Sequence, residues 1–165
     1  MATPTNLPAS FSTGAVLTAA QMNDLRGAFR VLQIVTATYA TQTSSSTSTY
    51  TDTGLSATIT PSATSSKILV FINQDGCGKQ TNNTYGRLRL LRGTTQILTF
   101  GNGFADTGNT DQNNIGTVSA MYLGSPATTS ATTYKTQFQS VNNSAIVYVQ
   151  IGSDNSSICL MEKFS

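Results

Sequence analysis

Apolar and polar residues alternate along most of this chain, and a period of two is typical of half-buried β-strands. The pattern predicts nine strands, separated by segments rich in Gly, Pro, Ser, Asn and Asp. The predicted strands are 31–40, 55–59, 67–74, 85–91, 96–100, 115–123, 132–141, 145–152 and 157–164. No helical pattern alternates with them, so the sequence favours an all-β, antiparallel β-sandwich over a parallel α/β sheet.

The connections between these strands also have recognisable patterns. Arg92-Gly93-Thr94-Thr95 predicts a hairpin turn, and Asn142-Asn143-Ser144 predicts a second tight turn. The other predicted connections are a Ser/Thr-rich loop at 41–49, a turn at 61–66 and a long loop at 101–114.

The first thirty residues follow a different pattern. Pro4, Pro8 and Gly14 predict an extended arm over residues 1–16. Thr18 and Gln21 then have the spacing of a helix capping box. Apolar residues at helical spacing surround this start, and they are Leu17, Met22, Leu25 and Phe29. The sequence therefore predicts an N-terminal arm with one short α-helix (1–30), followed by a β-sandwich head domain (31–165).

Three predicted strand segments, 69–72, 145–151 and 157–164, are apolar on both faces. A strand of this kind needs a cover on each side, and the sandwich core supplies only one. We expect a neighbouring copy of the chain to supply the second cover, although the helix or a loop of the same chain would also serve. The candidate interface residues are Val147, Tyr148, Val149, Cys159 and Met161.

The amino-acid composition indicates which classes of function are open to this fold. Charged residues make up 10% of the chain, which has no His, no Trp and a single Glu, whereas ordinary domains contain about 25% charged residues. Thr, Ser and Asn account for about a third of the chain. This mixture leaves little acid–base or metal chemistry, so the sequence predicts a structural or binding protein with no catalytic residue, cofactor or metal.

The sparse charge also bears on partners. The net charge is +2, and Arg87, Arg89 and Arg92 form the one cluster of basic residues. Binding to a phosphate backbone needs several basic contacts on one surface, so no nucleic-acid partner is expected. No apolar run approaches the roughly 20 residues of a membrane span, so no membrane insertion is expected either. The N-terminus lacks the pattern of a secretory signal, which favours synthesis in the cytoplasm without export by that route.

Two sets of residues leave alternatives open. Asp106 and Asp111 share one loop and could pair for glycan cleavage or hold Ca²⁺, but Asp beside Gly and Asn usually forms turns. Cys77 lies in a predicted loop and Cys159 in an apolar strand. Both are interpreted as free thiols, while a disulfide between them stays open.

One segment of the chain resembles a known group of proteins. Residues 11–26, Phe-Ser-Thr-Gly-Ala-Val-Leu-Thr-Ala-Ala-Gln-Met-Asn-Asp-Leu-Arg, resemble the N-terminal attachment segment of tailed-bacteriophage virion proteins, especially tail-fibre and baseplate appendages of cyanophages and marine phages. The β region resembles phage head domains with a trimeric jelly roll of the tumour-necrosis-factor and complement C1q type. The segments that carry this second resemblance are 52–61, 66–70, 87–93 and 158–162.

The resemblance implies a homotrimeric virion protein that is assembled in the cytoplasm of a host bacterium. Its arm and helix, through Leu17, Met22, Leu25 and Phe29, would dock on other virion proteins of the tail, baseplate or capsid. The leading expectation is a short tail or baseplate fibre that contacts the host cell surface. The alternatives are a capsid decoration protein that cements the head and, third, a glycan-cleaving appendage.

A fibre of this kind would bind a host surface glycan or another receptor. Aromatic side chains near strand ends could form its contact platform, and the candidates are Tyr85, Phe104 and Tyr122. The competing interpretation is that these aromatics close the ends of the sandwich.

Overall fold

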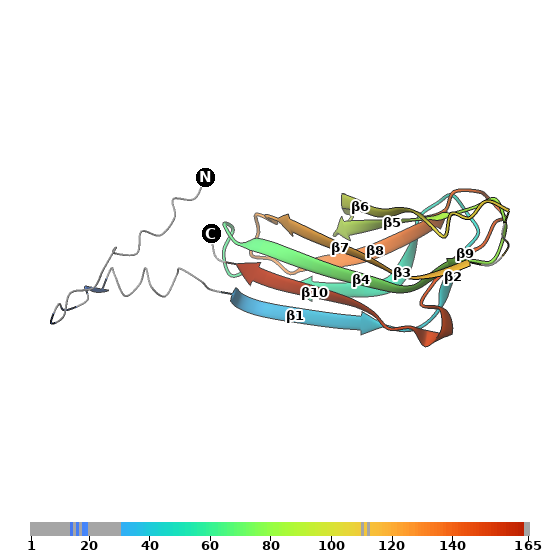
Figure 1. Ribbon diagram of the computed structural model, residues 1–165. Coiled ribbons are helices and arrows are strands. Elements are labelled where there is room, and N and C mark those ends of the chain that lie inside the picture. Colours follow the sequence, from blue (N-terminus) through green and yellow to red (C-terminus); the bar gives the residue numbers. More distant parts are fainter. Residues whose placement is uncertain are drawn as a thin grey trace.

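The computed structural model describes residues 31–109, 111 and 113–163, together with four separate positions at 14, 16, 18 and 19. Within these residues the chain forms two antiparallel sheets that pack face to face, which confirms the predicted all-β sandwich (Figure 1). The predicted arm and helix, with the candidates Leu17, Met22, Leu25 and Phe29, lie outside the described residues.

The first sheet, here called sheet A, contains four long strands and two short ones. Its long strands lie in the order β1 (Val31–Tyr39), β10 (Ser156–Lys163), β4 (Lys67–Lys79) and β7 (Asn113–Gly124). The short strands β9 (Val147–Val149) and β2 (Thr43–Ser45) continue the sheet from the far end of β4. Sheet B has the order β3 (Thr51–Ile59), β8 (Thr132–Ser140), β5 (Gly86–Arg92) and β6 (Thr95–Phe104).

The long strands pair in a nested order. β5 pairs with β6, β4 with β7, β3 with β8, and β1 with β10, so each pair encloses the previous one in the sequence. The chain therefore runs like one long antiparallel hairpin folded over two sheets. Contacts between residues distant in the sequence dominate a fold of this kind.

The core forms where the inward faces of the two sheets meet. In β3 the inward positions are Thr53, Leu55, Ala57 and Ile59, all buried, and the residues between them are exposed. The strict alternation predicted from the sequence is therefore present in this strand. The other fully buried apolar residues include Ile68, Val70, Leu88, Leu90, Tyr134, Phe138 and Leu160.

A series of four hydrogen-bonded polar side chains crosses this core between the two sheets. The Thr53 hydroxyl lies 2.6 Å from that of Thr136, which donates to Gln74 Oε1 at 2.9 Å. Gln74 Nε2 then donates to the hydroxyl of Ser156 at 2.9 Å. These bonds compensate for the removal of the four side chains from water.

Several boundaries differ from the sequence-based expectation. β4 continues to Lys79, five residues beyond the predicted end, so Cys77 lies in a strand and not in a loop. The pairing of β4 with β7 is irregular between Gln74 and Gly78, and Gly76 there has φ of +58°. A Cβ on Gly76 would lie 2.4 Å from the backbone nitrogen of Ile151, so only glycine fits this bulge.

Other segments are shorter or more regular than predicted. The expected strand 145–152 contains only β9, and a 3₁₀ turn (Ile151–Ser153) follows it. The predicted loop 41–49 contains β2, and the predicted loop 101–114 is shortened because β6 extends to Phe104 and β7 begins at Asn113. None of the described residues forms a helix long and apolar enough to cross a membrane.

Candidate subunit interface

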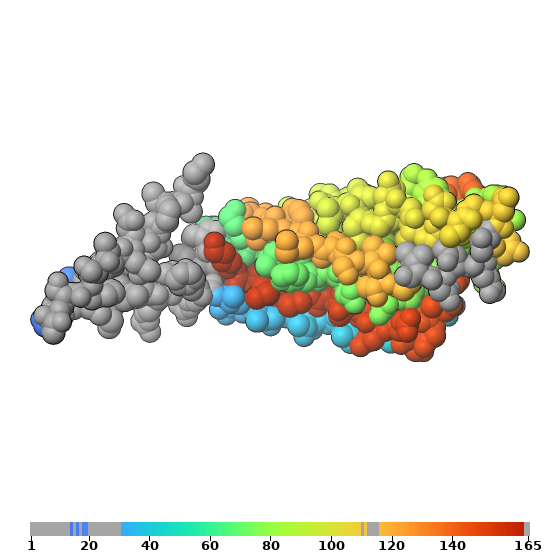
Figure 2. Space-filling view, in the orientation of Figure 1, coloured from blue at the N-terminus to red at the C-terminus, as the bar shows by residue number. Residues whose placement is uncertain are grey.

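The outer face of sheet A carries two adjacent rows of mainly apolar side chains. The strand register places Ile34, Met161, Leu69 and Leu123 in one row, and Thr36, Cys159, Phe71 and Met121 in the next. Figure 2 looks onto this face, where β1, β10, β4 and β7 lie side by side. We call the seven non-threonine residues of these rows the apolar patch.

The side chains of the apolar patch are more exposed than the inward-facing residues of the same strands. Ile34, Phe71, Met121 and Leu123 are 58%, 40%, 64% and 55% exposed, respectively. Leu69, Cys159 and Met161 are half-buried among them. A contiguous apolar surface of this kind on a β-sheet is a candidate protein–protein contact, because isolated monomers rarely present one.

The character of the same face changes along the strands. The next row contains Thr38, Ser157, Asn73 and Ser119, and the Ser119 hydroxyl donates to Asn73 Oδ1 at 2.7 Å. One step further, Thr117 donates to Asp75 Oδ1 at 2.6 Å. At the opposite limit of the patch, Lys163 pairs with Lys67. The patch is thus confined to the half of the face nearest the start of β1.

The patch includes two of the predicted interface residues and not the other three. Cys159 and Met161 point outward, whereas Val147, Tyr148 and Val149 are 0%, 4% and 0% exposed in the single chain. The prediction for the residues of β9 is therefore wrong. β9 lies between β4 and β2 in the sheet, and Val147 and Val149 join the core, so the same chain supplies both covers.

The candidate interface residues did not include five residues of the patch, Ile34, Leu69, Phe71, Met121 and Leu123, although Leu69 and Phe71 lie in segment 69–72, which was predicted to need a second cover. A signal for them was present, because the residues between the inward positions of β4 and β7 are also apolar in this region. That signal becomes a surface only once the register shows that the outward positions of separate strands are neighbours.

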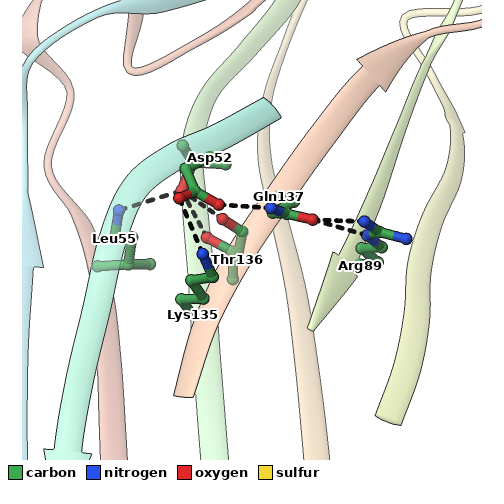
Figure 3. A network of polar contacts seen from close by, with 7 residues as sticks. Asp52, Leu55, Arg89, Lys135, Thr136 and Gln137 are labelled. Atoms are coloured by element: carbon green, nitrogen blue, oxygen red, sulfur yellow. Dashed lines mark hydrogen bonds and ion pairs between the residues drawn. The ribbon is translucent and has the colours of Figure 1, made fainter. Parts of the chain in front are cut away.

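The outer face of sheet B has a different chemistry (Figure 3). Lys135 Nζ lies 2.9 Å from Asp52 Oδ2, and Gln137 Nε2 donates to Asp52 Oδ1 at 2.5 Å. Arg89 donates twice to Gln137 Oε1, at 2.9 Å and 2.6 Å, and its guanidinium lies 3.9 Å from the ring centroid of Tyr50. Burial would raise the pKa of Asp52, but the hydrogen bonds from Lys135 and Gln137 outweigh it and lower that pKa.

The remaining arginines of the predicted cluster are also engaged with this chain. Arg87 donates to the hydroxyl of Tyr85 at 3.1 Å, with its guanidinium 5.5 Å from the centroid of that ring. Arg92 donates to the carbonyl oxygen of Ser125 at 2.8 Å. The three arginines therefore make internal contacts on and beside sheet B.

The three aromatic candidates do not gather into one platform. Phe104 is 4% exposed because its ring packs on Gly86, where a Cβ would lie 1.9 Å from a ring atom. Its assignment as a contact residue is therefore wrong. Tyr122 packs against the core from β7, and Tyr85 is half-buried beside Arg87.

The one glutamate of the chain serves the fold. Glu162 is buried and accepts hydrogen bonds from Gln33 Nε2 at 2.5 Å and from the Ser62 backbone nitrogen at 2.7 Å. Burial alone would raise the pKa of Glu162, but hydrogen bonds from Gln33 and Ser62 help to outweigh it and lower that pKa. The carboxylate thus joins β10 to β1 and to the turn before β4.

The other groups of chemical interest are separated from one another. Asp106 and Asp111 are exposed, and no three His, Cys, Asp or Glu side chains of the described segments are arranged to hold a metal ion. Cys77 and Cys159 are both free thiols. Burial, with a smaller effect of Asp75, raises the pKa of Cys77 to about 12.

No model of a known protein family matches the chain, and no curated protein matches its sequence.

Proposed function

We propose that this protein is a structural component of a tailed-bacteriophage virion, a homotrimer whose heads form a short tail or baseplate fibre that contacts the host cell surface. The observation that carries self-association, and with it the structural role, is the apolar patch on sheet A, while the number of three copies rests on the resemblance of the β region to trimeric phage head domains. The virion itself rests on the resemblance of residues 11–26 to phage attachment segments.

The nested strand pairing supports a jelly-roll head. In a jelly roll, eight strands form two sheets by folding one long antiparallel hairpin over itself. The pairs β1–β10, β3–β8, β4–β7 and β5–β6, divided between sheets A and B, have this arrangement. The short strands β2 and β9 are additions at one end of the sandwich.

The apolar patch supports self-association through the outer face of sheet A. In a cyclic assembly every copy presents the same surface to the rotation axis, so one patch per chain is sufficient. Because the patch ends at the row of Thr38, the copies would contact one another through apolar side chains near the start of β1. Nearer the end of β1 they would contact one another through polar side chains and water. Removal of the exposed Met121 and Leu123 side chains from water would drive the association.

A capsid decoration protein is the second candidate. The first strand of the head begins at Val31, so the sequence has no room for a long shaft between the predicted arm and the head. A short reach suits a protein that cements neighbouring capsid subunits as well as it suits a short fibre.

The oligomeric state is the first test. Light scattering of the purified full-length protein during size-exclusion chromatography is expected to give three times the mass of one chain. A stable single subunit at high protein concentration would overturn the proposal.

The position of Cys159 offers a second test on the same sample. The thiol lies within the patch, so a thiol reagent is expected to react about tenfold faster with a monomeric variant than with the assembly. Cys77 is expected to stay unreactive in both forms. Equal reactivity of Cys159 in both forms would place the interface elsewhere.

Electron microscopy of phage particles labelled with an antibody to the head would separate the two virion locations. Label at the tail, with loss of adsorption when the head is blocked, is the expected result. Label over the capsid, with loss of capsid stability when the protein is absent, would establish the decoration role.

A further inference from the structure

The end of the sandwich opposite the start of β1 is built from four loops, 46–49, 80–85, 105–109 and 141–146, here called the loop end. β4 connects the two ends of the sandwich. It begins at Lys67, which lies beside the start of β1 because Lys163 pairs with both Lys67 and Val31. It ends at Lys79, whose ammonium contacts two of these loops. Figure 1 shows the loops gathered at this end, away from the start of β1. We propose that the loop end is a preformed binding surface for a neutral, hydroxyl-rich oligosaccharide.

The four loops are cross-linked by backbone hydrogen bonds. The Asn83 nitrogen donates to the Gly108 oxygen at 2.9 Å, and Val141 donates to the Tyr85 oxygen at 3.1 Å. Ser144 donates to the Ser46 oxygen at 2.7 Å. Each bond joins loops far apart in sequence, so the loop end is one connected structure.

Side chains strengthen the same connections. Asn143 Oδ1 accepts from both the nitrogen and the hydroxyl of Ser48, at 2.9 Å and 3.1 Å, and Asn142 donates to the Asn83 oxygen. Beneath the surface, the hydroxyls of Thr84 and Ser140 lie 2.7 Å apart. Ordering these loops removes conformational entropy before any ligand arrives.

Lys79 is the central support of this arrangement. Its side chain is fully buried, and its ammonium donates to the carbonyl oxygens of Thr84 at 3.3 Å and Gly108 at 3.2 Å. A buried charge is expensive unless it is hydrogen-bonded, and the two bonds of Lys79 tie the loops 80–85 and 105–109 to the end of β4. Asn83 and Ser144 add backbone strain, with φ of 51° and 68°, of the kind that gathers at functional surfaces.

The exposed chemistry of the loop end defines the ligand. Its exposed side chains are hydroxyls and amides with one carboxylate, and they are Ser46, Thr47, Ser48, Thr49, Gln80, Asn82, Asn83, Asp106, Thr107, Asn109, Asn142, Asn143 and Ser144. Such groups match the hydroxyls of a sugar chain. Asp106 disfavours an anionic polymer, and the one ammonium beneath the surface is occupied by carbonyl oxygens.

This inference rests on the proposed host-contacting role, and it assigns that contact to the loop end. It replaces the scattered aromatic candidates with a continuous surface. The apolar patch lies nearest the other end of sheet A, so an assembly centred on the patch leaves the loops uncovered.

The test uses the full-length protein on an array of purified bacterial surface polysaccharides, both neutral and anionic. We expect binding to at least one neutral polysaccharide, with little change between low and about 0.5 M salt, because the contacts are uncharged. Asn143→Ala, which removes the bonds to Ser48, is expected to weaken binding at least about tenfold. Asn82→Ala changes only an exposed amide, so it tests the surface without disturbing the fold.

Ser56→Ala on the outer face of sheet B is the matched control and is expected to bind like the wild type. Binding to no neutral polysaccharide, or undiminished binding by both loop variants, would overturn the inference. Binding only to anionic polymers with steep salt dependence, or only to a protease-sensitive receptor, would also overturn it. The oligomeric mass measured on each sample keeps the two proposals separate, since a trimer without glycan binding contradicts only this one.

Discussion

The outer faces of sheets A and B have the same architecture and opposite chemistry. Each consists of four long antiparallel strands, with alternate residues pointing away from the shared core. Sheet B places Asp52, Lys135, Gln137 and Arg89 there, linked to one another by hydrogen bonds. Sheet A places the apolar patch there. The outer face of sheet B thus pairs its polar groups with one another, whereas the outer face of sheet A exposes apolar side chains to water.

Adjacent residues of one strand show the same contrast on a smaller scale. In β10, Ile158 and Leu160 are buried in the core, whereas Cys159 and Met161, which alternate with them, belong to the patch. Apolar residues on both faces of a strand are typical of sheets that are covered on both sides. The second cover in β10 is not supplied by the described part of this chain.

The largest expected effect comes from placing charge on the patch. Met121→Asp combined with Leu123→Asp should reduce the assembly to single chains, because association would bury unpaired carboxylates. Both side chains are more than half exposed in one chain, so the head itself should still fold. Light scattering measures the mass. The control is Ser56→Asp with Thr58→Asp on sheet B, which should leave the mass unchanged, and an unchanged mass for both variants would contradict the assigned interface.

The second expectation concerns the two faces of β10, tested in that monomeric background. Leu160→Ala should lower the free energy of unfolding by about 2–5 kcal/mol, because it opens a cavity in the core. Met161→Ala should lower it by less than about 1 kcal/mol, as for most surface positions. Urea denaturation measures both values, and similar losses from the two variants would show that Met161 packs within its own chain.

A smaller effect is expected at the buried carboxylate. The lowered pKa of Glu162 means that its stabilising effect is present above its usual value of 4.5 and is lost as the pH falls through the folded-state pKa. Glu162→Gln should lower the free energy of unfolding near neutral pH by about 1–3 kcal/mol, since the donors lose a charged acceptor.

The same substitution should also reduce the difference in stability between about pH 7 and about pH 3. Thermal unfolding at both pH values checks this expectation. An equally steep loss of stability in the variant would assign the acid sensitivity to other carboxylates.

The smallest effect is expected on sheet B. The Asp52 and Lys135 side chains are 52% and 31% exposed, and exposed ion pairs contribute less than about 1 kcal/mol. Asp52→Asn should therefore change the unfolding free energy only slightly, and less still at about 0.5 M salt. It should not change the oligomeric mass. A loss above about 2 kcal/mol would show that the polar network is a structural requirement.

The fold could be predicted from the sequence where one face of a strand is buried and the other is exposed to solvent. The alternation at Leu55, Ala57 and Ile59 defined β3, and the turn at Gly93 defined the hairpin between β5 and β6. Prediction was poorer where that contrast is lost. β4 continues through Asp75–Gly78 because pairing with β7 compensates for weak strand propensity, so Cys77 became a core residue.

The interface could be predicted only in part, for a related reason. A run of consecutive apolar residues shows that a strand has two apolar faces, but it does not show what covers each face. In β9 the described part of the chain covers both faces, whereas in β10 it leaves the outer face with Cys159 and Met161 partly exposed, although both segments have similar patterns. The register that brings Met121 beside Phe71 depends on long-range pairing, which no local pattern contains.

The pairing of β1 with β10 also determines how the head responds to tension. β1 pairs with β10 from Val31 to Tyr39, and antiparallel hydrogen bonds lie perpendicular to the strands. A force applied to Val31 along the axis of β1 therefore loads these hydrogen bonds together in shear, instead of breaking them one after another. A load that entered the head at Val31 would thus meet the pairing geometry that best resists mechanical extraction.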